Sequence, residues 1–261
     1  MEDSGRYSVQ SVIRALEIIE VLAESRESLG ITQITKTTGL SKTTTFRLVQ
    51  TLVKAGYVRK NNGDNEYSLG MKFLKISSSI LAKQDITSIA RPFLRQLSID
   101  TSEFVHLAIL DGGEVLYIDK IDSSDHAIRI FSTIGNRSPL HCTGLGKVLM
   151  SELPDKDVEE IAREKGLTRY TENSITDLAE LKKELESIRE LGYGLDNMEH
   201  EIGIRCVAAP LYDRTKKIVA AISVTAPEIY MPDERIPELA RVTRKVAREI
   251  SYLLGYTELS G

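Results

Sequence analysis

The sequence predicts an α+β protein in which a small helical module precedes a larger antiparallel sheet flanked by helices. Over the first 55 positions, apolar residues recur at steps of three and four, as in packed helices. From residue 85 onward, hairpin-connected β-prone runs are mixed with charged amphipathic helices. The predicted division is residues 1–69 for the first module, 70–84 for a linker helix and 85–261 for the second module.

The composition is that of an ordinary globular chain: 261 residues, 41% hydrophobic and 28% charged. No apolar run approaches the roughly 18 residues that a membrane helix needs, and MEDSGRYSVQ lacks the features of a secretion signal. The two cysteines, Cys142 and Cys206, have no CxxC or zinc-finger spacing, so no disulfide framework is expected. We therefore expect a cytoplasmic protein with no membrane partner.

The net charge of −4 hides a local basic segment. No carboxylate occurs between Glu27 and Asp64, whereas six cations lie in that interval: Lys36, Lys42, Arg47, Lys54, Arg59 and Lys60. Such a surface suits a polyanion, although a merely solvated basic face has the same composition.

The N-terminal module has the pattern of a helix-turn-helix. Apolar residues predict a first helix over residues 9–22, and a short helix follows over residues 32–38. Gly39 suits the left-handed residue of a tight turn, and Ser41 is a candidate N-cap for a second helix that extends to Ala55. Thr35 stands where most such motifs have Ala, which predicts slightly more open packing.

A hairpin follows, since YVRK and EYSLG are β-prone runs on either side of the turn-rich NNGDN. Three helices and such a hairpin make a winged helix-turn-helix, whose second helix enters the major groove of double-stranded DNA. The alternative is a winged helix that docks a protein. The candidate DNA-contacting residues are Ser41, Lys42, Thr43, Thr44, Arg47, Gln50, Arg59 and Lys60.

The predicted linker helix carries apolar residues at steps of four, three and four: Leu69, Phe73, Ile76 and Ile80. This seam could pair with a second copy of the chain or pack within its own subunit. The predicted helices of the second module cover residues 86–99, 143–151, 155–165, 176–191 and 233–254. Its predicted strands cover residues 103–110, 114–121, 127–131, 204–212 and 217–226.

Two polar clusters of the second module could carry chemistry. In SPLHCTGLGK, residues 138–147, two glycines near a helix start let a ligand carboxylate approach backbone amides, although a plain helix cap explains them too. The spacing matches neither a Walker loop nor a Rossmann fingerprint. In DNMEHEIGIRC, the acidic residues and His200 precede Cys206, but no metal-binding signature or activated-cysteine pattern is present.

Three blocks of sequence resemble the IclR-type bacterial transcriptional regulators: ITQITKTTGLSKTTTFRLVQTLVKAGYV with YSLG, SPLHCTGLGKVLMSEL, and GYGLDNMEHEIGIRCVAAPLYD. The resemblance implies a winged helix-turn-helix, a linker helix and a GAF/PAS-like effector domain, assembled as a homodimer or a dimer of dimers. By motif, it assigns the effector site to Ile130, Gly144, Leu145, Asp196, Ile204, Cys206, Ser223 and Thr225. Leu145 and Thr225-Ala226-Pro227 depart from the usual family residues, which bears on pocket volume and effector identity.

The expected function is therefore a ligand-responsive DNA-binding regulator with no catalytic residues, metal or cofactor. It would bind a near-palindromic operator and sense a small hydroxy, sugar or 2-oxo acid. The alternative is a metal-dependent or small-molecule enzyme with a winged-helix appendage.

Overall fold

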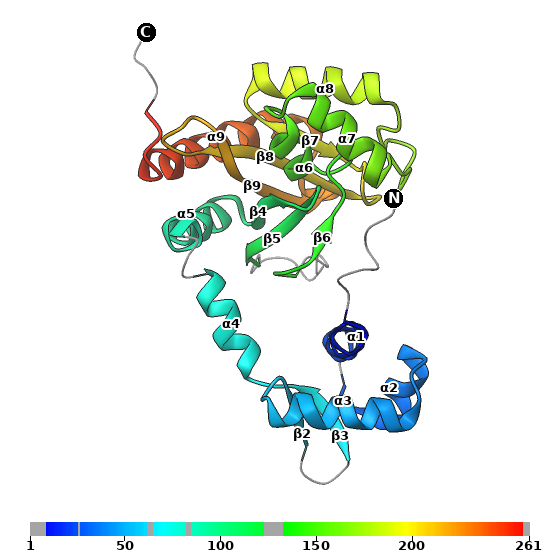
Figure 1. Ribbon diagram of the computed structural model, residues 1–261. Helices are drawn as coiled ribbons and strands as arrows, with labels where there is room; N and C mark the ends of the chain where they lie inside the picture. The colour runs from blue at the N-terminus through cyan, green and yellow to red at the C-terminus, as the bar shows by residue number, and fades with distance from the viewer. Residues whose placement is uncertain (1–8, 26, 62–64, 82–84, 123–132, 258–261) are drawn as a thin grey trace. The chain divides into compact units, whose positions relative to one another are not determined.

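A computed structural model describes the chain except for residues 1–8, 26, 62–64, 82–84, 123–132 and 258–261 (Figure 1). The chain divides into two compact units, Met1–Gln84 and Asp85–Gly261. Each unit has its own buried apolar core. Within the described residues, no helix combines the length and the apolar character needed to cross a membrane.

The described part of the N-terminal unit is a winged helix-turn-helix. Its helices are α1 (Gln10–Glu24), α2 (Ile31–Thr38), α3 (Lys42–Lys54) and α4 (Lys72–Leu81). Its strands are β1 (Leu29–Gly30), β2 (Val58–Lys60) and β3 (Glu66–Leu69), in the sheet order β1-β3-β2. The sequence prediction of this fold is confirmed.

The turn between α2 and α3 forms for the predicted reasons. Gly39 has a φ of 68°, a left-handed conformation. Glycine adopts it at little energetic cost because it has no Cβ. Ser41 caps α3, since its Oγ accepts a hydrogen bond from the amide of Thr44 at 3.2 Å. Both helices then pack on α1 through a core that includes Ile18, Ile34 and Val49.

The wing has one strand more than the sequence predicted. Leu29 and Gly30 form β1, which pairs with β3 at Tyr67 and Glu66. Two residues are too few to show the alternation that identifies a strand in a sequence. This strand forms because it pairs with β3. Its effect is to tie the segment before α2 to the wing.

The predicted linker seam is wrong in two of its positions. Leu69 belongs to β3, and Phe73 packs edge-on against Tyr57 of its own unit, with ring centroids 5.3 Å apart. Ile76 is exposed, and the side chain of Ile80 lies outside the described part of the chain. Of the three described seam residues, Leu69 and Phe73 therefore pack at least in part within one subunit, whereas Ile76 is exposed.

The C-terminal unit is a layered α+β fold. Its described helices are α5 (Asp85–Thr101), α6 (Gly144–Met150), α7 (Asp155–Lys165), α8 (Leu178–Leu191) and α9 (Ile236–Leu253), with short 3-10 turns η1 (Glu228–Tyr230) and η2 (Asp233–Arg235). Its strands are β4 (Phe104–Asp111), β5 (Glu114–Ile121), β6 (Arg137–Ser138), β7 (Gly194–Asn197), β8 (Ile204–Tyr212) and β9 (Ile218–Pro227). They form one antiparallel sheet in the order β6-β5-β4-β9-β8-β7.

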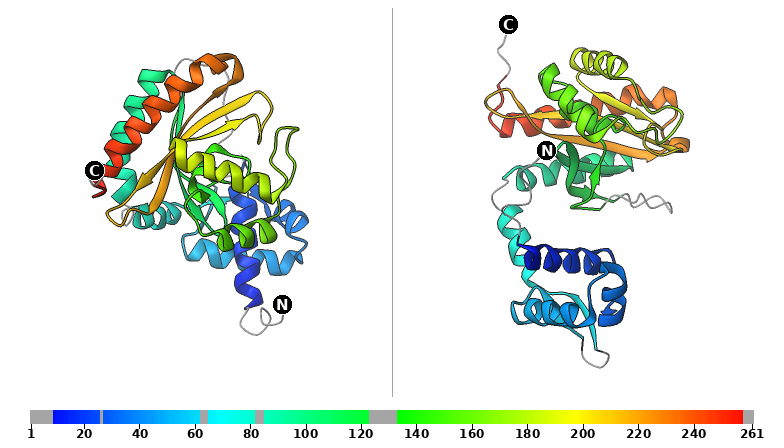
Figure 2. Two further views of the ribbon diagram at one scale, coloured as in Figure 1. Left: turned by 90° about the horizontal axis from the view of Figure 1, so that it is seen from above. Right: turned by 45° about the vertical axis from the view of Figure 1, so that its right-hand side comes forward.

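The two faces of the sheet bury different helices. Helices α5 and α9 lie side by side on one face, over residues such as Val207 and Ile222 (Figure 2). Helices α6, α7 and α8 pack on the other face, over residues such as Cys206 and Ala208. Because successive side chains of a strand point to opposite faces, Cys206 lies under α6 and Val207 under α9. The strand predicted over residues 127–131 lies outside the described residues.

Candidate functional site

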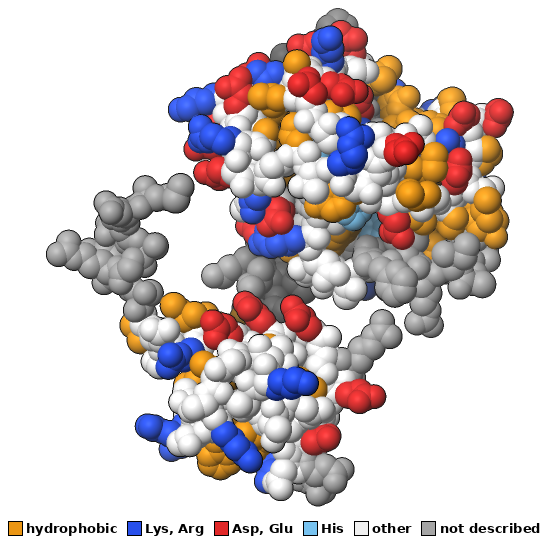
Figure 3. Space-filling view, turned by 90° about the vertical axis from the view of Figure 1, so that its right-hand side faces the viewer, with side chains coloured by type: hydrophobic (Ala, Val, Ile, Leu, Met, Phe, Trp, Pro, Cys, Tyr) orange, Lys and Arg blue, Asp and Glu red, His pale blue; other side chains and the backbone are white. Residues whose placement is uncertain are grey.

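The outward face of α3 is polar and cationic. Thr45 and Val49 of this helix are buried in the core, whereas Lys42, Thr43 and Arg47 are exposed. Arg59 and Lys60 of β2 are exposed on the wing. Figure 3 shows Lys and Arg side chains beside exposed hydrophobic atoms at the lower end of the N-terminal unit.

Several of the predicted DNA-contacting side chains already have partners within the unit. Gln50 Nε2 donates to the hydroxyl of Tyr67 at 3.2 Å, and Arg59 Nε donates to Ser68 Oγ at 2.9 Å. These two hydrogen bonds fix the orientation of the Gln50 and Arg59 side chains. The hydroxyls of Ser41 and Thr44 hydrogen-bond each other at 2.9 Å, so both residues serve the helix cap.

The C-terminal unit contains a polar cavity of about 210 Å³ between the start of α6 and the adjacent face of the sheet. Five residues that the family resemblance assigned to the effector site line it: Leu145, Asp196, Ile204, Cys206 and Thr225. The other lining residues are His106, Tyr117, Asn136, Arg137, Ser138, Thr143, His200 and Glu201.

Strand register brings the distant lining residues together. Asp196 pairs with Cys206 across β7 and β8, and Cys206 pairs with Thr225 across β8 and β9. The three side chains therefore form a row across the sheet. The sequence analysis placed Asp196 ahead of a strand rather than in one, because β7 has only four residues and its sequence, GLDN, shows no alternation of apolar and polar side chains, although its burial does alternate.

A neutral imidazole lies at one end of this row. His106 Nδ1 is 3.3 Å from Thr225 Oγ1 and 3.4 Å from Ser223 Oγ. Burial and, secondarily, the charge of Lys120 lower the pKa of His106 to about 3, so the ring is uncharged at neutral pH. The ring of Tyr117 packs edge-on against it at 5.4 Å. Ser223 is buried behind Thr225 and does not line the cavity.

The glycines of the TGLG segment serve packing. A Cβ on Gly146 would lie 2.4 Å from backbone atoms of Leu140, and one on Gly144 would lie 3.2 Å from Cys206. The sequence analysis attributed these glycines to the close approach of a ligand. In the structure, other parts of the protein approach their backbone instead. Thr143 caps α6 by accepting from the amide of Gly146 at 3.1 Å, while the described chain offers no acceptor to the amides of Gly144 and Leu145.

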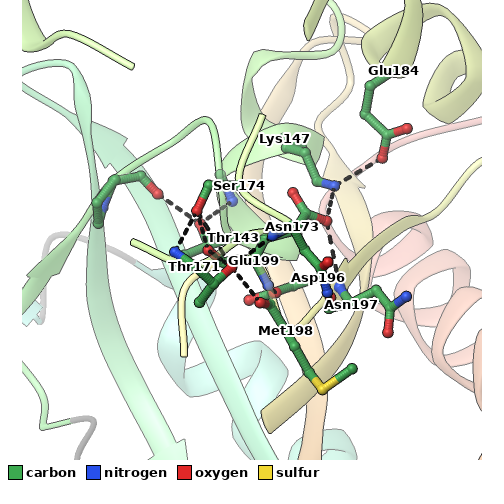
Figure 4. A network of polar contacts seen from close by, with 12 residues as sticks. Thr143, Lys147, Thr171, Asn173, Ser174, Glu184, Asp196, Asn197, Met198 and Glu199 are labelled. Carbon is green, nitrogen blue, oxygen red and sulfur yellow. Dashed lines mark hydrogen bonds and ion pairs between the residues drawn. The ribbon is translucent and has the colours of Figure 1, made fainter. Parts of the chain in front are cut away.

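A buried ion pair positions the turn after β7 (Figure 4). The side chain of Lys147 is 1% exposed, and its Nζ lies 2.6 Å from Glu199 Oε1 and 2.8 Å from Glu184 Oε1. The amide of Glu199 in turn donates to Asp196 Oδ1 at 2.7 Å. Ser174 Oγ donates to the carbonyl of Glu199 at 2.6 Å. These contacts connect α6, α8 and the segment between α7 and α8 to the carboxyl group of Asp196.

Burial sets the protonation of the groups around Asp196. Burial raises the pKa of Asp196 to about 7; the nearby charge of Glu199 adds to this effect, and Lys147 opposes it. Burial also raises the pKa of Cys206 and of Cys142 to about 12. Both thiols are therefore protonated, which argues against a cysteine nucleophile.

The described residues contain no group of three His, Cys, Asp or Glu side chains arranged to hold a metal ion. Ile130, a predicted lining residue, lies outside the described part of the chain. Sequence reasoning missed His106 and Tyr117, each a polar residue within an apolar strand. That signal is weak, because a buried polar side chain is as often satisfied inside the core.

Comparison with known proteins defines the class. Residues 11–62 match the family described as "IclR helix-turn-helix domain", and residues 78–252 match "Bacterial transcriptional regulator IclR C-terminal". The chain is 37% identical over 254 residues to the "HTH-type transcriptional regulator KdgR" of Escherichia coli, covering 97% of this chain and 96% of that protein. It is 32% identical over 249 residues to the "Transcriptional repressor IclR" of Escherichia coli, covering 95% and 90%.

The fold is similar to the crystal structure of the Thermotoga maritima IclR, with a TM-score of 0.82 at 32% identity, covering 95% of this chain and 99% of that one. The protein is thus a DNA-binding transcriptional regulator rather than an enzyme. Within that class, the chain belongs to the IclR family. The family expectation is confirmed, and the enzymatic alternative is not supported.

Replacing Lys147 tests the buried pair. Lys147→Met leaves the buried carboxylate of Glu199 without its cation, so the free energy of unfolding should fall by about 3–5 kcal/mol. Lys182→Met is the control, because Lys182 bonds Asp155 and Glu159 at the surface and its loss should change stability little. Urea unfolding measures both. Equal small losses would contradict a structural role for Lys147.

The raised pKa of Asp196 predicts a pH dependence of stability. Between pH 4 and 7 the folded state keeps a proton that the unfolded state releases, so stability falls as the pH rises. The slope reaches at most about 1.4 kcal/mol per pH unit. Asp196→Asn keeps the Oδ1 acceptor and cannot ionise, so the variant should gain stability relative to wild type between pH 5 and 7. Urea unfolding at several pH values checks this, and a constant difference would exclude it.

Proposed function

We propose that the cavity of the C-terminal unit binds a small organic acid, whose binding changes the affinity of the N-terminal unit for its DNA operator. One observation carries this proposal: five side chains that are far apart in the sequence, those of Leu145, Asp196, Ile204, Cys206 and Thr225, converge on one partly open polar cavity. Its volume of about 210 Å³ equals roughly seven waters, the size of a small hydroxy, sugar or 2-oxo acid. A ligand in this cavity can alter DNA affinity only if it binds the DNA-binding state of the protein and the non-binding state with different affinities.

The lining supports an acid with a polar body. Gly144 does not line the cavity itself, but its amide and that of Leu145, at the start of α6, would donate to a ligand carboxylate. Asp196 faces the same space, and its raised pKa lets it take up a proton instead of repelling an anion. Thr225, which lines the cavity beside the neutral ring of His106, would then offer its hydroxyl to a hydroxyl or keto oxygen of the ligand.

The N-terminal unit supplies the DNA contacts. The outward face of α3 would enter the major groove, where Arg47 and Gln50 reach base edges and Lys42 reaches phosphates. Arg59 and Lys60 of the wing would bind the adjacent backbone. A regulator that binds DNA in this way would act in the cytoplasm.

A homodimer explains an exposed apolar stripe on α1. Val12, Ile13 and Leu16 lie on one side of this helix, and half of the Leu16 side chain is exposed (52%). A stripe of this kind is typical of a protein contact. Two copies related by a two-fold axis would present paired α3 helices to a near-palindromic operator. The α1 stripe thus replaces the Leu69 and Phe73 seam as the proposed contact.

The effector proposal predicts a loss of binding in Thr225→Val, which removes one hydroxyl at nearly constant volume. In wild type, members of a panel of hydroxy, sugar, aromatic and 2-oxo acids should raise the melting temperature. Thr225→Val should bind the most stabilising acid about 3-fold to 10-fold more weakly, the value of one hydrogen bond. Isothermal titration calorimetry measures this affinity.

Thr257→Val, an exposed change in the same unit, is the control and should bind as wild type does. DNA binding by the ligand-free Thr225→Val variant should also be unchanged. An unaltered acid affinity in Thr225→Val would place the effector site elsewhere.

The dimer proposal predicts that Leu16→Glu dissociates the protein. Loss of a buried leucine contact and burial of a charge should raise the dimer dissociation constant more than tenfold. Gln10→Glu adds the same charge at an exposed position of α1 and is the matched control. Sedimentation equilibrium measures both. A Leu16→Glu protein that stays as dimeric as Gln10→Glu would exclude this contact.

A further inference from the structure

An aromatic side chain stands in the middle of the polar face of α3. Phe46 has half of its side chain exposed (50%), while the core of the unit takes Thr45 and Val49 from the same helix. Lys42 and Gln50 lie four residues before and after Phe46, so the three side chains share one face of the helix. Folding of the unit gives no reason for a phenyl ring at this position, since burial of a ring is what stabilises a core.

The surroundings of the ring favour a polyanion over a second copy of the chain. Lys42 and Arg47 flank Phe46 in a stretch without carboxylates. A second copy seated on this face would bring these cations against their own counterparts, and like charges across an interface are unfavourable. The exposed stripe of α1 offers an apolar contact to a second copy without this cost.

Base chemistry narrows what the ring can recognise. In the major groove, bases present hydrogen-bond donors and acceptors, and one apolar group, the 5-methyl of thymine. A phenyl ring has no hydrogen-bonding group and can distinguish base pairs only through that methyl group. The residues of an inserted helix that reach base edges lie toward its N-terminal end, and Phe46 is the fifth residue of α3.

We propose that Phe46 is a specificity-determining residue that contacts the 5-methyl group of a thymine in each half-site of the operator. This inference rests on the proposed role of α3 as the DNA-reading helix. Gln50, whose amide donates to the hydroxyl of Tyr67, lies one turn further along the same face of the helix. Loss of the ring would therefore relax specificity at one base pair per half-site, rather than weaken binding to all DNA equally.

Removal of single methyl groups tests the proposal. Duplexes bound by the full-length wild-type chain are selected from a random pool, and each thymine of the selected site is then replaced singly by deoxyuridine. This replacement removes only the methyl group. At one symmetry-related pair of positions, each replacement should weaken wild-type binding about fourfold, the value of one buried methyl group.

Phe46 variants connect this effect to the ring. Phe46→Ala should bind the thymine and deoxyuridine duplexes equally at those positions, and Phe46→Leu should keep part of the difference. Arg47→Ala is the matched control on the same helix: it should bind DNA more weakly but keep the full fourfold methyl effect. Because Phe46 is half-exposed, the melting temperature of Phe46→Ala should stay near that of wild type.

Two results would overturn the proposal while leaving DNA binding by α3 intact. One is a wild-type protein that tolerates every deoxyuridine replacement, and the other is a methyl effect that persists in Phe46→Ala. A wild-type chain that selects no duplex, or an Arg47→Ala variant with unchanged affinity, would instead remove α3 from the DNA interface and overturn the proposed function with it.

Discussion

The buried contact between Lys147 and Glu199 is the constraint on which the polar cavity of the C-terminal unit depends. Burial lowers the pKa of Lys147, but Glu199 and Glu184 more than offset this and hold the pKa above its usual value, so Lys147 carries its charge. Such a pair contributes little net stability, because desolvation costs about as much as the attraction returns. Its effect is geometric: it holds the turn after β7 against α6, and that turn donates to the carboxyl of Asp196.

The described polar groups at the centre of the cavity carry no fixed positive charge. His106 is neutral, Cys206 is protonated, and Asp196 changes its charge near neutral pH. Arg137 lines the cavity, but its guanidinium is bound by Asp111. An anion bound beside Asp196, as proposed above, would favour the protonated carboxyl and so couple ligand binding to proton uptake.

The TGLG segment is a case in which the sequence alone is compatible with two structural interpretations. Two glycines before a helix are compatible with a ligand and with close packing, and the one-dimensional pattern is the same in both cases. Gly146 lies against the backbone of Leu140, and Gly144 lies against Cys206, a residue far away in the sequence. Only the neighbours in space decide between the two interpretations. The ligand hypothesis now rests on the cavity and on the backbone amides at the start of α6, and not on the missing side chains of the glycines.

The sequence by itself determined the fold class, the helix-turn-helix and most of the strands. These features depend on local periodicity, on the left-handed Gly39 and on the cap at Ser41, and each of these is specified by a few neighbouring residues. The tertiary structure alone decided which distant residues meet. It placed Asp196, Cys206 and Thr225 in one row, because the register of β7, β8 and β9 is set by the packing of the whole sheet. It also decided that Phe73 packs inward and Phe46 outward, since exposure depends on neighbours that no local pattern of apolar residues specifies.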